Sequence, residues 1–178
     1  MKYYLSSFKI GDYEKKLVEM TENGNKNVTF ISNALDFATD LVRRSKSDKL
    51  DIADLKRLGF NVNILDLKKY INKSNELEET LEQYDVIWVR GGNVFVLAQA
   101  MMLSGFKDII LKYHKKNREI VYGGYSAGIC ILGPTLLGLH LVDDPNQKPY
   151  GEQYQTIWDG LNITDYVIVP HYKSDHPE

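Results

Sequence analysis

The chain has 178 residues, of which 43% are hydrophobic and 26% are charged, and its formal net charge is −2. This length fits one domain with a sizeable core and is short for two. The composition is typical of a globular protein and excludes a disordered chain. Because 22 basic and 24 acidic side chains nearly balance, neither nucleic acid nor an acidic membrane is expected as the main partner.

The cysteine content and the distribution of apolar residues limit the cellular compartments in which the protein is expected. A single cysteine, Cys130, excludes an intramolecular disulfide and a cysteine-rich metal site. The apolar run at residues 3–5 is too short for a secretory signal. No apolar run reaches the roughly 18 residues that a membrane span needs. We therefore expect a cytoplasmic protein.

Short apolar runs alternate with amphipathic segments in the first half of the chain. The predicted strands, which are rich in β-branched and aromatic residues or alternate in polarity, are residues 3–5, 28–31 and 60–67. The predicted helices are residues 12–22, 36–58 and 76–83. We expect the second helix to be broken into two pieces near residues 45–47 and to end at Gly59.

The second half continues the same alternation. The predicted strands are residues 85–89, 119–123 and 166–169, and the predicted helices are residues 94–103 and 106–114. Residues 85–89 are apolar enough to be buried on both faces of a sheet. This order of elements predicts an α/β sandwich with a mostly parallel sheet. Residues 140–159, rich in Asp, Pro, Gln and Gly, are expected to form a long surface loop.

No internal repeat or linker divides the chain, so we expect a single domain over residues 1–178. The chain stops at Glu178, soon after the last predicted strand and without a closing helix. That ending suggests that the domain lacks its C-terminal end.

The strongest chemical signal is a G-x-S-x-G motif at residues 124–128, directly after a predicted strand and before a predicted helix. Glycines allow the tight turn that exposes the hydroxyl of Ser126 at the edge of the sheet. The amide of Ala127, the next residue, then faces the place where negative charge develops. The motif predicts a serine nucleophile, and the alternative is a purely structural turn.

A serine nucleophile needs a base, and the chain has four histidines. His171 follows the predicted strand 166–169 and therefore lies at a carboxyl edge, where functional groups of α/β sheets collect. The others are less suited: His114 lies in a basic helix face, His140 lies between two leucines, and His176 is near the end. His171 is the predicted base; a capping role in a surface turn is the alternative.

A second glycine-rich turn, Arg90-Gly91-Gly92-Asn93, also follows a buried strand and precedes a helix. Its amides can supply a second oxyanion donor beside Ala127. Asn93 is a candidate substrate-binding residue. The turn matches neither of the glycine patterns that bind phosphates or dinucleotides.

These motifs together resemble peptidase family S51, which contains the aspartyl dipeptidases (peptidase E) and the cyanophycinases. The resemblance is carried by Gly91-Gly92-Asn93-Val94-Phe95, by Tyr125-Ser126-Ala127-Gly128 with Pro134-Thr135, and by Pro170-His171-Tyr172. It implies a flavodoxin-like fold similar to that of class I glutamine amidotransferases, a Ser126 nucleophile, a His171 base and an oxyanion hole made by Gly92 and Ala127. It also implies cytoplasmic hydrolysis of dipeptides with an N-terminal aspartate, without metal or cofactor.

The third member of the family's triad is an aspartate shortly after the Pro-Thr pair. Without a gap this position falls on Leu141, whereas two extra residues place it on Asp143, where Asp143-Asp144-Pro145 reproduces the Asp-x-Pro spacing. Asp143 is therefore either the triad acid that orients His171 or an ordinary loop aspartate. Cys130, one helical turn after the serine, is interpreted as a packed core residue.

The sequence thus predicts a serine peptidase that acts on small peptides, as a monomer or small homo-oligomer. One alternative is a serine esterase or amidase of α/β-hydrolase type, which usually needs more chain than the 45 positions from Ser126 to His171. The other is a catalytically silent homologue, suggested by the uncertain triad acid and the long 140–159 loop.

Overall fold

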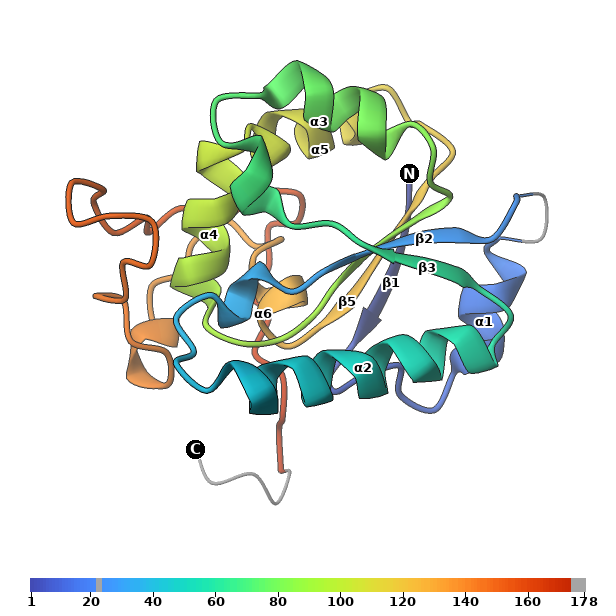
Figure 1. Ribbon diagram of the computed structural model, residues 1–178, viewed down its shortest axis with the longest axis horizontal. Helices are drawn as coiled ribbons and strands as arrows, with labels where there is room; N and C mark the ends of the chain where they lie inside the picture. The colour runs from blue at the N-terminus through green and yellow to red at the C-terminus, as the bar shows by residue number, and fades with distance from the viewer. Residues whose placement is uncertain (22–23, 174–178) are drawn as a thin grey trace.

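The computed structural model describes residues 1–21 and 24–173 (Figure 1). At its centre is a five-stranded sheet in which all pairings are parallel and the strand order is β1-β5-β4-β2-β3. The strands are β1 (Lys2–Ser6), β2 (Asn27–Ile31), β3 (Asn61–Ile64), β4 (Val86–Val89) and β5 (Val121–Tyr125). Because all strands are parallel, their carboxyl ends meet at one edge of the sheet.

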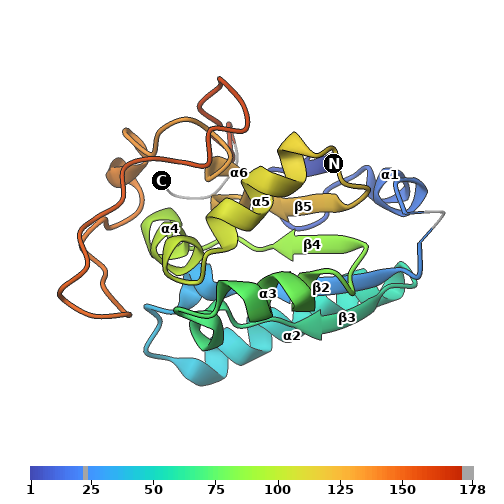
Figure 2. The ribbon, with the colours of Figure 1, turned by 90° about the horizontal axis from the view of Figure 1, so that it is seen from above.

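Helices cover both faces of the sheet and produce three layers (Figure 1 and Figure 2). The helices on one face are α1 (Glu14–Glu19) and α2 (Leu41–Arg57), and those on the other face are α3 (Ser74–Leu81), α4 (Val94–Leu103) and α5 (Phe106–Lys115). Short 3-10 helices lie between them, η1 (Asn33–Leu35) and η2 (Leu67–Tyr70). The predicted α/β/α sandwich is confirmed.

Two separate hydrophobic clusters hold these layers together. Strand β4 is buried at all four positions, as its apolar sequence predicts. Trp88 packs in the cluster beneath α1 and α2, whereas Ile87 packs in the cluster beneath α3, α4 and α5. Successive side chains of a strand point to opposite faces, so one short strand contributes to both cores. Full burial of each large apolar side chain stabilises the fold by about 1.5–3 kcal/mol.

Helix α2 corrects the prediction of two broken pieces. It is one uninterrupted helix of 17 residues, and it begins at Leu41 rather than near residue 36. Asp40 fixes the start, since its side chain accepts a hydrogen bond from the Arg43 amide at 2.9 Å. Serine costs an α-helix only a few tenths of a kcal/mol, which packing of the helix easily exceeds. The serines at 45 and 47 therefore do not break it.

The predicted strand at residues 166–169 is also wrong. These residues are not part of the sheet, and Tyr166, Val167 and Val169 are exposed. An extended segment becomes a strand only when a neighbour takes up its backbone hydrogen bonds. No described residue forms a strand pair with this segment. The chain instead contacts the residue after β1, because the His171 amide donates to the Ser7 hydroxyl at 2.8 Å.

Beyond α6 (Ala127–Cys130), the described chain up to residue 173 has little regular structure. It contains one 3-10 helix, η3 (Leu139–Leu141), and one isolated bridge between Thr135 and Asp159. Figure 2 shows the loops of this segment gathered beside α4. The long loop predicted at residues 140–159 is confirmed.

Among the described residues, no single helix combines the length and apolarity needed to cross a membrane. Helices α4 and α5 together reach those values, but the chain bends by 83° between them and α4 is almost entirely buried.

Candidate active site

Ser126 is the single residue that joins strand β5 to helix α6. Its φ of 50° and ψ of −122° lie in a region that residues other than glycine rarely adopt. Such strain persists only where the surrounding structure enforces it, and it concentrates at functional sites. Ser126 therefore has the strained strand-to-helix turn that the G-x-S-x-G motif predicts.

The glycines of the motif are needed because strand β4 runs directly against the turn. A Cβ on Gly124 would lie 2.3 Å from the carbonyl oxygen of Val89, and one on Gly128 would lie 2.1 Å from the same atom. A Cβ on Gly123 would likewise meet the Trp88 ring at 2.7 Å. Gly123 and Gly124 lie within β5, and Gly128 lies within α6. Strand β5 therefore ends at Tyr125, two residues later than predicted.

The Gly91-Gly92 turn follows β4 and lies beside the serine turn. Val89 and Gly124 are paired in the two neighbouring strands, so the chain leaves both strands at the same level. Gly92 has a φ of +147°, and a Cβ there would lie 2.6 Å from the Ala34 carbonyl oxygen. A Cβ on Gly91 would lie 2.8 Å from the Cβ of Ser126. Only glycines allow the two turns to approach so closely.

Two backbone amides beside Ser126 are free to bind an anion. Neither the Gly92 N–H nor the Ala127 N–H donates to an acceptor within residues 1–21 and 24–173. Ala127 is the first residue of α6, so its amide has no acceptor inside the helix. Paired amide donors at such a turn are the usual means of stabilising the oxyanion of acyl transfer.

Both turns open into one cavity of about 480 Å³ at the carboxyl edge of the sheet. Residues of six separate segments line it: Phe8, Leu35, Arg90, Gly91, Gly92, Tyr125, Ser126, Ala127, Cys130, Leu139, Leu141, Val142, Asp143, Val169, Pro170 and His171. Most of the lining is apolar, with a few polar groups around Ser126. This volume and lining are typical of small-molecule sites.

His171 lies in the same cavity as Ser126, as predicted for the base. It has a φ of 64°, and its ring is T-shaped against Phe8 at 6.3 Å between centroids. Phe8 in turn packs against Tyr125, the residue before the serine. In the part of the chain that the structure describes, no hydrogen bond joins the Ser126 hydroxyl to the His171 ring.

Asp143 also lines the cavity, but its carboxylate binds the start of α4. Its Oδ2 accepts a hydrogen bond from the Val94 amide at 2.8 Å, and burial raises the pKa of its carboxyl group. None of the described residues donates a hydrogen bond to its other oxygen. No ion pair joins Asp143 to His171 in the part of the chain that the structure describes, so the triad role of Asp143 stays a prediction.

Asn93 is the N-cap of helix α4. Its Oδ1 accepts hydrogen bonds from the Phe95 and Val96 amides at 2.9 and 3.1 Å, and its Nδ2 donates to the Asp144 carbonyl at 2.8 Å. The side chain is buried and does not line the cavity. The structure therefore gives Asn93 a role in holding α4 and the loop, while a direct substrate contact stays a prediction.

The remaining candidates lie away from the reacting groups or are buried. Cys130 lines the floor of the cavity, but burial raises the pKa of its thiol to about 12, which leaves it protonated near neutral pH. His114, near the end of α5, is hydrogen-bonded to the Tyr3 hydroxyl at 2.7 Å and does not line the cavity. His140 packs against Trp158. His176 lies outside the described residues.

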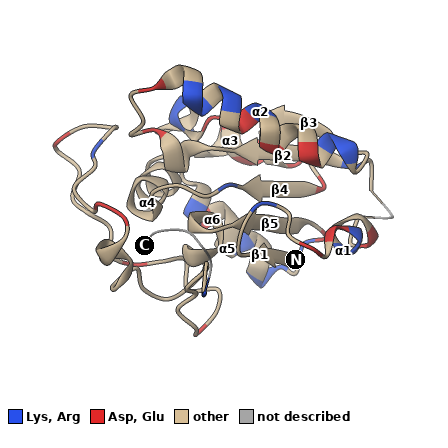
Figure 3. Cartoon of the chain, turned by 90° about the horizontal axis from the view of Figure 1, so that it is seen from below, with Lys and Arg blue, Asp and Glu red and all other residues tan. Residues whose placement is uncertain are grey.

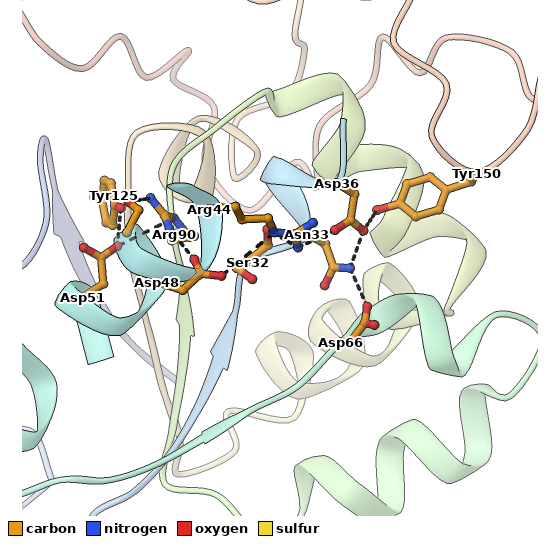
Figure 4. Close-up of polar contacts among 11 residues, drawn as sticks. Ser32, Asn33, Asp36, Arg44, Asp48, Asp51, Asp66, Arg90, Tyr125 and Tyr150 are labelled. Atoms are coloured by element: carbon orange, nitrogen blue, oxygen red, sulfur yellow. Dashed lines mark hydrogen bonds and ion pairs between the residues drawn. The ribbon is translucent and has the colours of Figure 1, made fainter. Parts of the chain in front are cut away.

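One group of polar residues was missed by the sequence analysis. Figure 3 shows basic and acidic residues along α2, and the side chains of Asp48 and Asp51 among them are largely buried. Asp48 and Asp51 of α2 contact Arg90, which directly precedes Gly91-Gly92, and Tyr125, which directly precedes Ser126 (Figure 4). The spacing of two aspartates one helical turn apart, and an arginine directly after an apolar strand, are the signals that could have revealed this group.

Comparison with known proteins agrees with this geometry. Residues 6–178 match the model of peptidase family S51. An uncharacterized peptidase of Listeria innocua is 31% identical over 173 residues, which are 97% of this chain and 76% of that protein. Peptidase E of Actinobacillus pleuropneumoniae is 29% identical over 104 residues, which are 58% of this chain and 40% of that enzyme.

Solved structures show the same likeness. A crystal structure of a Listeria monocytogenes protein assigned to peptidase E has a TM-score of 0.73 at 29% identity, covering 98% of this chain and 81% of that one. A peptidase from an acI-B1 actinobacterium has a TM-score of 0.68 at 18% identity, and it supports the fold alone.

The fold and the turn at Ser126 define a hydrolase of the flavodoxin-like α/β class. The chain belongs to peptidase family S51 and is a serine-type peptidase.

Proposed function

We propose that this protein hydrolyses small peptides, with Ser126 as the nucleophile and His171 as the base. The observation that carries the proposal is the strained Ser126 turn facing a cavity that His171 also lines, beside two amides that donate to no acceptor among the described residues. The two side chains are 45 positions apart in the sequence and line the same cavity. This arrangement is what acyl transfer requires.

In the proposed mechanism, the Ser126 oxygen attacks the carbonyl carbon while the His171 ring takes the hydroxyl proton. The amides of Gly92 and Ala127 donate to the oxyanion of the tetrahedral intermediate. His171 then gives its proton to the leaving amine, and the acyl group stays on Ser126. Water, deprotonated by His171, releases it in the second half of the cycle. Catalytic hydrogen bonds are often long without substrate, and we expect the serine–histidine bond to tighten when substrate binds.

We further propose that Asp143 stabilises the imidazolium that His171 becomes. Its carboxylate lines the same cavity and keeps one oxygen free of donors among the described residues. The charge of an oriented acid favours the protonated ring and fixes its tautomer. Neutralising Asp143 should therefore slow the reaction without removing the nucleophile.

The preference for an N-terminal aspartate is the finer part of the proposal and rests on the family resemblance. Arg90 is the one lysine or arginine among the described residues that line the cavity, and Asp48 and Asp51 already pair with it. A screen of Asp-Leu against Leu-Leu and Ala-Leu tests this preference. We expect Asp-Leu to be hydrolysed fastest; equal rates would remove the aspartyl preference and leave the peptidase.

The nucleophile is tested by Ser126→Ala, which should abolish dipeptide hydrolysis and labelling by a fluorophosphonate probe while leaving the melting temperature nearly unchanged. Mass spectrometry of the labelled wild type should place the adduct on Ser126. Unchanged turnover in the variant, or an adduct elsewhere, would overturn the proposed mechanism. The cytoplasmic location and the oligomeric state stay predictions from the sequence.

A further inference from the structure

Residues 47–51 of helix α2 contact both Arg90, directly before Gly91-Gly92, and Tyr125, directly before Ser126 (Figure 4). The Tyr125 hydroxyl, directly before Ser126 in the chain, donates to Asp51 Oδ2 at 2.5 Å. The Arg90 guanidinium, directly before Gly91, donates to Asp48 and to the Ser47 hydroxyl, the latter at 3.1 Å. Arg90 Nε also lies 3.6 Å from Asp51 Oδ2. The two turns are thus connected through one helix face.

These polar groups are buried. The side chains of Arg90 and Asp51 are only 8% and 5% exposed, and that of Asp48 is 13% exposed. In such surroundings hydrogen bonds to charged groups are strong and directional, and the geometry of a planar guanidinium is demanding. Burial raises the pKa of Asp51, whereas the Tyr125 hydroxyl and the Arg90 charge oppose that rise. The group therefore holds its members in one arrangement.

That arrangement fixes distances that matter for the reaction. Gly91 touches the nucleophile turn, since a Cβ there would lie 2.8 Å from the Ser126 Cβ and 2.9 Å from the Tyr125 ring. A shift of Arg90 relative to Tyr125 would change the distance between the Gly92 amide and the serine oxygen. Displacements of about 1 Å at reacting groups can cost roughly a hundredfold in rate.

We propose that Asp51 and Asp48 are positioning residues of the hydrolytic site, which hold the nucleophile turn and the oxyanion turn in register through Tyr125 and Arg90. This inference rests on the proposed function of Ser126. Replacement of buried ion pairs by apolar groups is often neutral for stability, so stability alone does not account for such a group. A positioning role predicts a loss of turnover that exceeds any loss of stability.

The chain provides a matched control. Tyr150, in the 140–159 loop, donates to Asp36 Oδ2 at 2.5 Å, the same length as the Tyr125–Asp51 bond (Figure 4). Tyr150 precedes neither turn and does not line the cavity. Tyr125→Phe and Tyr150→Phe therefore each remove one hydroxyl from an equivalent hydrogen bond, and only the first change is next to the nucleophile.

The experiment measures kcat, KM, the rate of fluorophosphonate labelling and the melting temperature. The substrate is the dipeptide that the wild type hydrolyses fastest. The proteins compared are wild type, Tyr125→Phe, Tyr150→Phe, Asp51→Ala and Asp51→Asn. For Tyr125→Phe we expect kcat and the labelling rate to fall about tenfold with KM within about twofold of wild type. Tyr150→Phe should keep the wild-type kcat. Asp51→Asn, which retains an oxygen that can accept from Tyr125, should recover part of the kcat that Asp51→Ala loses.

Wild-type kcat and labelling in Tyr125→Phe would overturn the inference. So would an equal fall of kcat in Tyr125→Phe and Tyr150→Phe, because that result would show a general structural effect. If Asp51→Ala does not fold, the two tyrosine variants still decide the question. Ser126→Ala in the same assays separates the two proposals: activity in that variant contradicts the nucleophile itself, whereas its inactivity together with a wild-type Tyr125→Phe contradicts only the positioning role.

Discussion

The two halves of the proposed active site are held in place in very different ways. Ser126 and Ala127 lie at the junction of a fully buried strand and a buried helix, where Gly124 and Gly128 leave no room beside the Val89 carbonyl. His171 lies instead in an irregular segment whose apolar residues are largely exposed, and its backbone is tied to Ser7 by one hydrogen bond. The nucleophile is fixed by core packing, whereas the base lies outside the sheet and contacts Ser7 and Phe8 of the loop after β1.

This difference has a functional consequence. A nucleophile and oxyanion donors that are set before substrate arrives need no reorganisation during the reaction. A base on a less constrained segment can complete its hydrogen bond when the substrate fills the cavity. Substitutions of the closely packed glycines at the serine turn should therefore damage stability and activity together, whereas substitutions in the segment from residue 134 to 171 should affect them separately.

The largest effect is expected for Gly128→Ala. The new Cβ would lie 2.1 Å from the Val89 oxygen, and relief of that clash requires the turn to move off β4. We expect a loss of about 3 kcal/mol or more in the free energy of unfolding, measured by chemical denaturation. Gly138→Ala is the comparison in the irregular region. Gly138 has a φ of +98°, and no atom lies within 4 Å of an added Cβ. Only the cost of a left-handed backbone for alanine, about 1–2 kcal/mol, is therefore expected. Equal losses would contradict the contrast between the halves.

Gly92→Ala should come next. Its φ of +147° and the Ala34 oxygen at 2.6 Å force the backbone to shift, which moves an oxyanion donor away from the serine. We expect kcat to fall about a hundredfold, as for loss of one such donor. Gly59→Ala serves as the control, because it also has a positive φ but has free space around the added methyl group. Full activity in Gly92→Ala would remove its amide from the oxyanion hole.

Asp143→Asn should affect activity and stability in opposite directions. If Asp143 stabilises the imidazolium, kcat should fall about tenfold or more. Burial raises the pKa of the Asp143 carboxyl in the folded state, so the folded protein binds that proton more tightly than the unfolded chain does. The resulting stability is present below the unfolded pKa of about 3.8 and is lost as pH rises through the folded pKa.

The asparagine variant lacks this proton and should therefore lose less stability than wild type as pH rises. At pH 7 it should be at least as stable as wild type, since its amide oxygen can still accept from Val94. Denaturation curves between pH 3 and pH 7, roughly the range in which carboxyl groups titrate, measure this difference. A variant with wild-type kcat would leave Asp143 with a structural role at α4 only.

Gln99→Leu should have the smallest effect on stability. The Gln99 Nε2 donates to the Gln147 carbonyl at 2.9 Å and so ties α4 to the long loop, while its buried Oε1 has no hydrogen-bond partner among the described residues. Loss of the hydrogen bond should lower the free energy of unfolding by about 1 kcal/mol. Removal of the buried, unsatisfied oxygen should raise it by about the same amount. We expect a nearly unchanged unfolding free energy and faster cleavage by a glutamyl endopeptidase after Glu152, which is exposed in the same loop. Unchanged cleavage would show that this bond does not hold the loop.

Local sequence patterns predicted most of the layers of this fold. Alternation of apolar runs and amphipathic segments predicted the five strands that exist, and the fully apolar strand β4 is buried on both faces as expected. The same reasoning failed at residues 166–169, because an apolar extended run looks identical whether or not a neighbouring strand accepts its hydrogen bonds. The same reasoning wrongly predicted a break in α2 near Ser45 and Ser47, because packing of the helix outweighs the low helix propensity of serine.

The sequence by itself determined the turn chemistry. The G-x-S-x-G motif and the Gly91-Gly92 pair act within a few residues of chain, and their conformations follow from what glycine and serine can adopt. The tertiary structure alone decided which distant groups meet them: His171 in the cavity, Asp143 at the start of α4, and Asp48 and Asp51 beneath both turns. Such contacts depend on how parallel strands and helices pack, so the sequence can offer candidate residues but does not fix which of them come together.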